Sequence, residues 1–244
     1  MSTLTKITVA FSLILLASIE TTSPFAKGCT SNTKGKEVTK TVKTQPYDVV
    51  KVVGSMDVYL INGSEGSISV TADENTHKYI IVESDGNTLT ISLKNNAALR
   101  KTGSIKIKVP FKKLSEVTLT GSGEVESEDV IKNSSLNINL KGSGEMDLVV
   151  EATSIDAKVN GSGEMELKGK VTDFEIKATG SGEFNGKSLL AENTQVYISG
   201  SGNAKVNAKQ SLKARINGSG NIAYGGNPPA NDSKVLGSGS ISPF

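Results

Sequence analysis

Apolar and polar residues alternate along much of this chain, most regularly between residues 136 and 216. An alternation with a period of two is typical of strands that bury one face and expose the other. β-Branched residues, which favour strands, are frequent in these runs. The pattern predicts an all-β protein with these inward residues: Leu136, Ile138, Leu140, Met146, Leu148, Val150, Ile155, Ala157, Val159, Met165, Leu167, Phe174, Ile176, Ala178, Val196, Ile198, Ala204, Val206, Ala208, Leu212, Ala214 and Ile216.

A Gly-Ser-Gly triplet interrupts the alternation at nearly constant intervals. It begins at positions 121, 142, 161, 180, 200, 218 and 237, which gives spacings of 21, 19, 19, 20, 18 and 19 residues. Helical repeats are longer than about 30 residues and propeller blades are about 40. A leucine-rich repeat has a similar length, but its Leu and Asn pattern is absent here. The spacing therefore predicts a β-solenoid, that is a single-stranded β-helix, with coils of about 19 to 20 residues.

Each triplet is expected to form the corner between two strands of one coil. A sharp bend requires positive φ or a close backbone approach, and glycine tolerates both. The predicted corner glycines are Gly121, Gly123, Gly142, Gly144, Gly161, Gly163, Gly180, Gly182, Gly200, Gly202, Gly218, Gly220, Gly237 and Gly239.

Residues 45–115 carry the repeat in a degenerate form. "GSISV" at 66, "GNTLTI" at 86 and "GSIKIKV" at 103 each place a glycine before alternating strand formers, at similar intervals. One interpretation is that the solenoid continues upstream. The other is a β-meander cap, because "ESDGNT" has the Asp-Gly pair of a tight hairpin and solenoid ends need a cap. Residues 45–244 are expected to form one domain, with regular repeats over 116–244.

The stretch "YDVVKVVGSMDVYLINGSEGSISVTADENTHKYI", the later "DGNTLTISLK" and the triplets together resemble a family of exported bacterial proteins, the putative auto-transporter adhesin, head GIN domain family. The resemblance covers roughly residues 45–226, and Gly54, Ser55, Met56, Asp57 and Val58 match the family's opening strand. It implies a right-handed β-helix and an adhesive or envelope-associated role. It implies no catalytic residues.

The N-terminal residues have the features of a signal peptide, expected over residues 1–26. Lys6 precedes a 13-residue apolar run, and Ala26 offers a small residue for cleavage. The run is shorter than the roughly 20 residues of a transmembrane helix. Residues 27–44 are polar and are expected to be a disordered lead-in. Cys29, the one cysteine, is either lipidated after export or a free thiol.

The charge balance excludes a general affinity for nucleic acid. Lys plus Arg number 27 and Asp plus Glu number 25, so the formal net charge is +2. Tryptophan is absent, which disfavours stacking sites for sugars, although a flat polar face can bind glycans through hydrogen bonds. The expected partner is a protein or glycan at a surface, and uncapped edges leave homo-oligomers open.

An acidic residue follows four of the triplets, as Glu124, Glu145, Glu164 and Glu183. Stacked corners would place these carboxylates about 4.8 Å apart in a ladder. One hypothesis is a row of Ca²⁺ sites, since Ca²⁺ prefers oxygen ligands. The other is a solvated row that neighbouring cations offset. Those cations would come from a column with a basic bias, formed by the residues three before each triplet: Thr118, Asn139, Lys158, Lys177, Tyr197, Arg215 and Lys234.

Evidence for an enzyme is weak. His77 is the one histidine, which leaves a Ser-His-Asp triad without support, and it is expected on a polar loop. The triplet lacks the Lys-Ser/Thr ending of a phosphate loop, so no nucleotide cofactor is expected. Pectate-lyase-like β-helices use clustered aspartates with a basic catalyst; Arg215 has no such cluster beside it in the sequence.

We expect a non-enzymatic exported protein of the periplasm, outer membrane surface or extracellular space, either an adhesin-like module or a structural or envelope-stress protein. A Ca²⁺-dependent polysaccharide-binding or polysaccharide-active protein is a further alternative.

Overall fold

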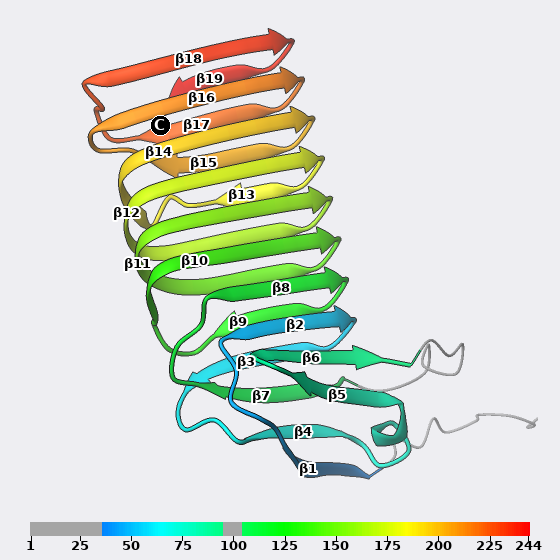
Figure 1. Cartoon of the computed structure of the whole chain (residues 1–244). Coiled ribbons are helices and arrows are strands. Elements are labelled where there is room, and N and C mark those ends of the chain that lie inside the picture. Colours follow the sequence, from blue (N-terminus) through cyan, green and yellow to red (C-terminus); the bar gives the residue numbers. More distant parts are fainter. Residues whose placement is uncertain (1–35, 95–103) are drawn as a thin grey trace, which may run out of the picture. The chain divides into compact units, whose positions relative to one another are not determined.

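The computed structural model describes residues 36–94 and 104–244. Within these residues nineteen strands join into one continuous sheet that winds into a solenoid of stacked coils (Figure 1). The expected signal peptide, Cys29 and the first part of the expected lead-in lie outside the described residues. The all-β solenoid predicted from the repeat is confirmed.

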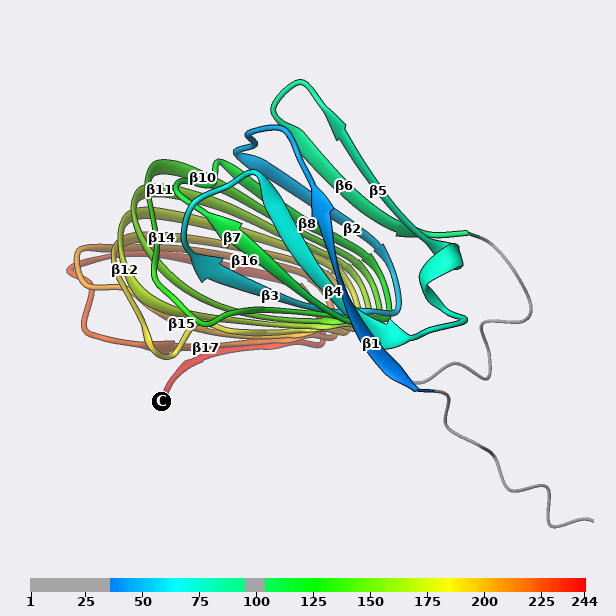
Figure 2. The same ribbon diagram turned by 90° about the horizontal axis from the view of Figure 1, so that it is seen from below.

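Each regular coil has one strand that leads into the glycine corner and one that leaves it. We call the stack of entering strands the pre-corner sheet and the stack of leaving strands the post-corner sheet; Figure 2 shows the two converging at the corners. The regular strands are β8 (Glu116–Gly121), β9 (Glu124–Ser127), β10 (Ile131–Gly142), β11 (Glu145–Gly161), β12 (Glu164–Gly180), β13 (Glu183–Asn185), β14 (Leu189–Gly200), β15 (Asn203–Asn207), β16 (Ser211–Gly218), β17 (Asn221–Gly225), β18 (Ala230–Gly237) and β19 (Ser240–Pro243).

Strands β11 and β12 are the longest because each runs without interruption from one corner to the next. They pair in parallel from Glu145 opposite Glu164 to Gly161 opposite Gly180. Between their two halves they turn along a third side of the solenoid. Gly169 lies at this turn of β12 with φ +120°, and a Cβ there would lie 2.0 Å from the carbonyl oxygen of Val150. The sequence pattern did not single out this glycine, since it stands outside any triplet.

The triplets form corners that repeat from coil to coil. The carbonyl oxygen of Gly142 accepts hydrogen bonds from the amides of Ser162, at 2.9 Å, and Gly163, at 3.0 Å, in the next coil. The first glycine of every predicted triplet has φ between +110° and +138°. Its register partners are the first glycines of the neighbouring coils. The structure therefore places the first glycines of the seven triplets in one column along the stack.

The N-terminal residues combine both alternatives left open by the sequence. Two further coils extend the solenoid, one of β2 (Val49–Gly54) and β3 (Asp57–Asn62), the other of β6 (Thr88–Leu93) and β7 (Lys106–Phe111). The β2–β3 coil lies between the β6–β7 coil and the β8–β9 coil, since β2 pairs with both β6 and β8. The stacking order therefore departs from the chain order, which the regular intervals did not predict.

The bottom end of the solenoid is a cap of antiparallel strands (Figure 1). β5 (Ile80–Asp85) forms a hairpin with β6 through the turn at Gly86, whose φ is +57°, so the hairpin predicted from Asp-Gly is confirmed. β4 (Ser67–Asp73) pairs antiparallel with β7 and with β1 (Glu37–Lys43), and a short 3₁₀ turn (His77–Tyr79) joins β4 to β5. Antiparallel strands thus cover the end of a parallel stack.

Strand β1 corrects, for residues 37–43, the expectation of a disordered lead-in over 27–44. Its seven residues pair with the whole length of β4, from Glu37 opposite Asp73 to Lys43 opposite Ser67. The segment is polar, but four of its seven residues are β-branched, and Val42 packs against the core while its neighbours face solvent. Polar composition hid the strand because an edge strand exposes most of its side chains.

The core fills the space between the two sheets. Every inward residue predicted from the alternation is buried, so that part of the prediction is confirmed. Phe174 and Phe184 contact each other with ring centroids 5.4 Å apart. In the last coil, Asn231 and Ser233 follow Leu212 and Ala214 in the inward columns. Polar residues therefore replace apolar ones at these two positions of the last described coil.

Candidate functional site

Outward side chains form straight columns on the pre-corner sheet because the coils stack in register. The main column holds the residue three positions before each corner. From bottom to top it contains Lys51, Thr118, Asn139, Lys158, Lys177, Tyr197, Arg215 and Lys234. We call it the basic column. The sequence predicted seven of its members; Lys51 was missed, although its corner "GSM" resembles a triplet.

Carboxylates are frequent in the neighbouring column, which holds the residue two positions earlier on each strand. We call it the acidic column; it contains Glu116, Asn137, Asp156, Glu175, Gln195, Lys213 and Asp232. Lys158 Nζ lies 3.4 Å from Asp156 Oδ1, and Lys177 pairs with Glu175 in the same way. The hydrogen bond to Glu175 raises the pKa of Lys177 above its ordinary value. Carboxylates on one side of the basic column therefore neutralise part of its positive charge.

Arg215 and Asp232 pair across neighbouring coils of the same face. The Arg215 guanidinium donates to the carboxylate and to the backbone oxygen of Asp232. The hydrogen bond to the carboxylate lowers the pKa of Asp232 below its ordinary value. The contact ties β16 to the edge strand β18.

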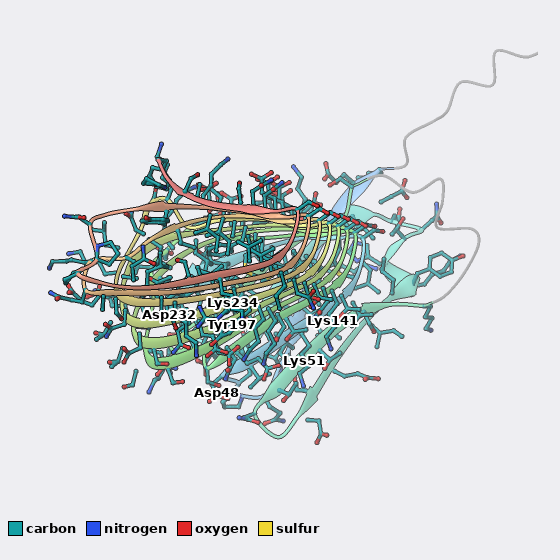
Figure 3. All side chains as sticks on the ribbon, turned by 90° about the horizontal axis from the view of Figure 1, so that it is seen from above. Asp48, Lys51, Lys141, Tyr197, Asp232 and Lys234 are labelled. Atoms are coloured by element: carbon teal, nitrogen blue, oxygen red, sulfur yellow. The ribbon has the colours of Figure 1, made fainter. Side chains whose placement is uncertain are left out.

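Tyr197 is the aromatic member of the basic column. Its ring lies between two cations, with Lys177 Nζ at 5.8 Å and Lys213 Nζ at 5.7 Å from the ring centroid. Its hydroxyl donates to Gln195 Oε1 at 2.8 Å. Figure 3 shows Tyr197, Lys234 and Asp232 on one side of the solenoid, together with Lys51 and Lys141.

Two shallow hollows lie on this face, one on each side of the basic column. The first has a volume of about 710 Å³ and is lined mainly by carboxylate, amide and hydroxyl side chains, among them Asp173, Asn193, Gln195 and Asp232. The second has a volume of about 350 Å³ and includes Lys177, Tyr197, Arg215 and Lys234. The pre-corner sheet therefore offers a hollowed polar face with one aromatic ring at its centre.

The glutamates after the triplets form a second column, on the post-corner sheet. Glu124, Glu145, Glu164 and Glu183 are register partners in successive coils, as the spacing predicted. Asp57 extends the column downward, so the carboxylates number five; we call these five the acidic ladder. Above them Asn203, Asn221 and Ser240 continue the column, and Ser240 and Asn221 each donate a hydrogen bond to the residue below.

Like charges along the ladder disfavour ionisation. Burial, and then the charges of Asp57 and Glu145, raise the pKa of Glu124. Burial, and then the charges of Glu183 and Glu145, raise the pKa of Glu164. Glu183 is relieved by Lys205, whose Nζ lies 3.2 Å from Glu183 Oε1. The ladder is a source of repulsion that the fold tolerates at its surface.

A shorter acidic column lies beside the ladder, formed by Glu126, Asp147 and Glu166. Lys168 Nζ lies 2.8 Å from Asp147 Oδ2 and 3.6 Å from Glu166 Oε2. The hydrogen bond to Asp147 raises the pKa of Lys168. Lys168 therefore neutralises part of the column formed by Glu126, Asp147 and Glu166.

The expectation that the basic column offsets the ladder is wrong. The two columns lie on opposite sides of the glycine corner, on sheets that face different directions. The basic column pairs instead with the acids of its own sheet. Lys168 pairs with Asp147, in the short column beside the ladder. The two columns are close in sequence but not in space. The chain changes direction sharply at the corner between them, so their side chains face different directions.

The described residues contain no group of three or more His, Cys, Asp or Glu side chains with the geometry to hold a metal ion. The hypothesis of Ca²⁺ along the ladder therefore gains no support beyond the register itself. His77 lies in the cap, where its Nε2 is 2.9 Å from the carbonyl oxygen of Val38. Across residues 36–94 and 104–244, no helix could span a bilayer.

Stacked parallel coils, glycine corners and regular outward columns define the chain as a β-solenoid with extended polar faces. The chain belongs to the family described as putative auto-transporter adhesin, head GIN domain, whose pattern matches residues 46–228. The resemblance inferred from the sequence is confirmed. No curated protein matches the chain.

Solved structures share the fold over most of the chain. A putative adhesin from Bacteroides fragilis is 22% identical with a TM-score of 0.81. A putative lipid binding protein from Parabacteroides distasonis is 29% identical with a TM-score of 0.71. A putative adhesin from Parabacteroides merdae is 24% identical with a TM-score of 0.69. Each alignment covers 86% of this chain and 97% of the other.

Proposed function

We propose that this protein is a non-enzymatic surface-interaction module of the adhesin type, exported to the periplasm, the outer membrane surface or the extracellular space. Its membership of an adhesin-like family supports the proposal. So does the N-terminal apolar run that follows Lys6, which is typical of a signal peptide.

The outward face of the pre-corner sheet is the observation that carries the proposal. Charged, amide and hydroxyl groups recur there once per coil, and two hollows of about 710 and 350 Å³ border the column that contains Tyr197. A rigid solenoid presents such groups at fixed spacing, which favours binding to an extended or repetitive partner.

An adhesion assay tests the proposal. The purified full chain is coupled to beads, and retention on bacterial envelope preparations and on animal cell surfaces is measured under flow. A double variant, Lys177→Ala with Tyr197→Ala, is expected to lose most of the retention. Lys132→Ala is the matched control, because Lys132 is an exposed, ion-paired lysine on β10, outside both hollows. No retention of the wild-type protein would contradict the proposal, and equal retention of all three proteins would exclude this face as the contact surface.

Localisation separates adhesion from a periplasmic structural or envelope-stress role. Protease added to intact producing cells is expected to digest an adhesin displayed at the surface. Digestion only after the outer membrane is opened would favour the structural role.

A second candidate function is lipid binding. The third side of the solenoid has a hollow of about 840 Å³ whose lining includes Ala152, Val171, Ala191 and Ala208, and Leu190 at its rim is 59% exposed. The P. distasonis protein named above is described as a putative lipid binding protein. Binding of a fluorescent fatty acid, weakened by Leu190→Asp, would support this candidate; its absence would exclude fatty acids as the lipid.

A further inference from the structure

The smaller hollow of the pre-corner sheet has two chemically different walls. Lys177, Tyr197, Arg215 and Lys234 of the basic column form one wall. Residues two positions further along each strand form the other: Thr179, Ser199, Asn217 and Leu236. We call this hollow the basic trough. It runs along the solenoid axis across β12, β14, β16 and β18.

The trough is positively charged although its cations have carboxylate neighbours. Its lining contains no Asp or Glu. Glu175 and Asp232, the partners of Lys177 and Arg215, belong to the acidic column on the far side of the basic column. Lys234 has no carboxylate within 4.0 Å among the described residues. An anionic group in the trough would therefore meet cations first.

The opposite wall offers neutral hydrogen-bonding groups at one per coil. Thr179, Ser199 and Asn217 are exposed, and in the described part of the chain none of their side chains has a hydrogen-bond partner. Hydroxyl and amide groups both donate and accept hydrogen bonds. Such groups suit a ligand that carries many hydroxyls as well as negative charge.

We propose that the basic trough binds an acidic saccharide. Its carboxylates would pair with Lys177, Arg215 and Lys234 through charge-assisted hydrogen bonds. Its hydroxyls would bond to Thr179, Ser199 and Asn217 of the opposite wall. The inference rests on the proposed function, since it names the ligand class of the same face.

The charge pattern favours a saccharide over other anionic partners. Duplex DNA carries one negative charge per about 1.7 Å of axis, and its backbone would also meet the acidic column at Asp156, Glu175 and Asp232. A protein interface of standard size usually has an aromatic-rich core, whereas the trough has one aromatic ring and about 350 Å³ of space. A chain of hydroxyl-rich units with sparse carboxylates matches both walls.

Calorimetry with the full chain tests the inference. The probes are oligosaccharides that bear galacturonic, glucuronic or sialic acid, each beside its carboxyl-reduced neutral analogue. At least one acidic probe is expected to bind, more weakly at high salt, and its neutral analogue to bind at least tenfold more weakly. Lys234→Ala is expected to weaken binding about tenfold, and Thr179→Ala a few-fold. Lys132→Ala, on the third side, should bind as the wild type does.

The outcomes separate this inference from the proposed function. If the beads adhere to cell surfaces but no acidic probe binds or competes, the saccharide inference is overturned and the adhesin proposal stands. If an acidic probe binds in a manner that depends on Lys234 but no surface retains the beads, the inference stands and adhesion fails. Equal binding of acidic and neutral analogues overturns the role of the cations. Circular dichroism of Lys234→Ala checks that the variant is folded.

Discussion

The carbonyl oxygen of Gly142 lies only 2.3 Å from the position that a Cβ on residue 161 would occupy. The same oxygen accepts the amides of Ser162 and Gly163, so it cannot move away without breaking both bonds. Gly161 also has φ +125°, a conformation that residues with a side chain rarely adopt. Two independent constraints therefore demand glycine at this corner.

Gly161→Val is expected to destabilise the protein by about 1 to 3 kcal/mol or more, because it combines backbone strain with a steric clash. Lys158→Ala, on the same strand, should be nearly neutral because its ion pair with Asp156 is exposed. Urea unfolding followed by circular dichroism measures both. Equal tolerance at the two positions would contradict the corner assignment.

Glu164→Gln is expected to stabilise the protein at pH 7 by a few tenths to about 1 kcal/mol, since it removes repulsion from Glu145 and Glu183. The folded-state pKa of Glu164 is raised, so the folded state binds this proton at pH values where the unfolded chain has lost it. The repulsion is therefore relieved as the pH falls toward the raised pKa. The advantage of the variant should shrink between pH 7 and pH 5 in thermal unfolding.

Glu151→Gln is the control for the ladder, because Glu151 pairs with Lys132 at 3.0 Å instead of facing like charges. It should not gain stability at pH 7. A Glu164→Gln protein that is less stable than the wild type at pH 7 would show that the ladder is not repulsive.

Divalent cations test the Ca²⁺ hypothesis on the same ladder. We expect millimolar Ca²⁺ and Mg²⁺ to raise the unfolding temperature to the same small extent, because both screen the repulsion between carboxylates. A rise specific to Ca²⁺, lost in the Glu145→Gln and Glu164→Gln double variant and on adding chelator, would instead establish a binding site by ligand linkage.

Tyr47→Phe tests the attachment of β7, in the lowest coil of the solenoid, to the chain that leads into β2 in the coil above it. Tyr47 is 3% exposed, and its hydroxyl donates to the carbonyl oxygen of Pro110 in β7. Burial raises the pKa of this phenol. The variant is expected to lose about 1 kcal/mol, because a part-buried carbonyl loses its partner. Tyr79→Phe, whose ring is only partly buried in the cap, should cost less; equal losses would contradict this role for Tyr47.

The regular part of the solenoid was predictable because its information is local. Alternation with a period of two assigns each side chain to one face, and a triplet every 19 or so residues assigns the corners. The inward position of Ile138 and the register of Glu145 with Glu164 follow from these two rules alone.

The cap was less predictable because its pairings are not local. Gly66, Gly86 and Gly103 have the spacing of corners, yet Gly86 lies in a hairpin turn and Gly66 precedes an antiparallel strand; Gly103 lies outside the described residues. Polar strand β1 gains its conformation from β4, about 30 residues later. Spacing cannot distinguish a turn from a corner when the partner strand is distant in sequence.

The sequence by itself determined the coil length, the glycine corners, the inward columns and the acidic ladder, since each depends on residues within one repeat. Only the tertiary structure decided that the β2–β3 coil lies between two later coils, and that the basic column and the ladder face apart. It also decided that Lys177, Tyr197, Arg215 and Lys234 share one trough with Thr179, Ser199 and Asn217. The physical reason is that these relations depend on the stacking of whole coils and on the direction of each sheet after a bend, which no local pattern encodes.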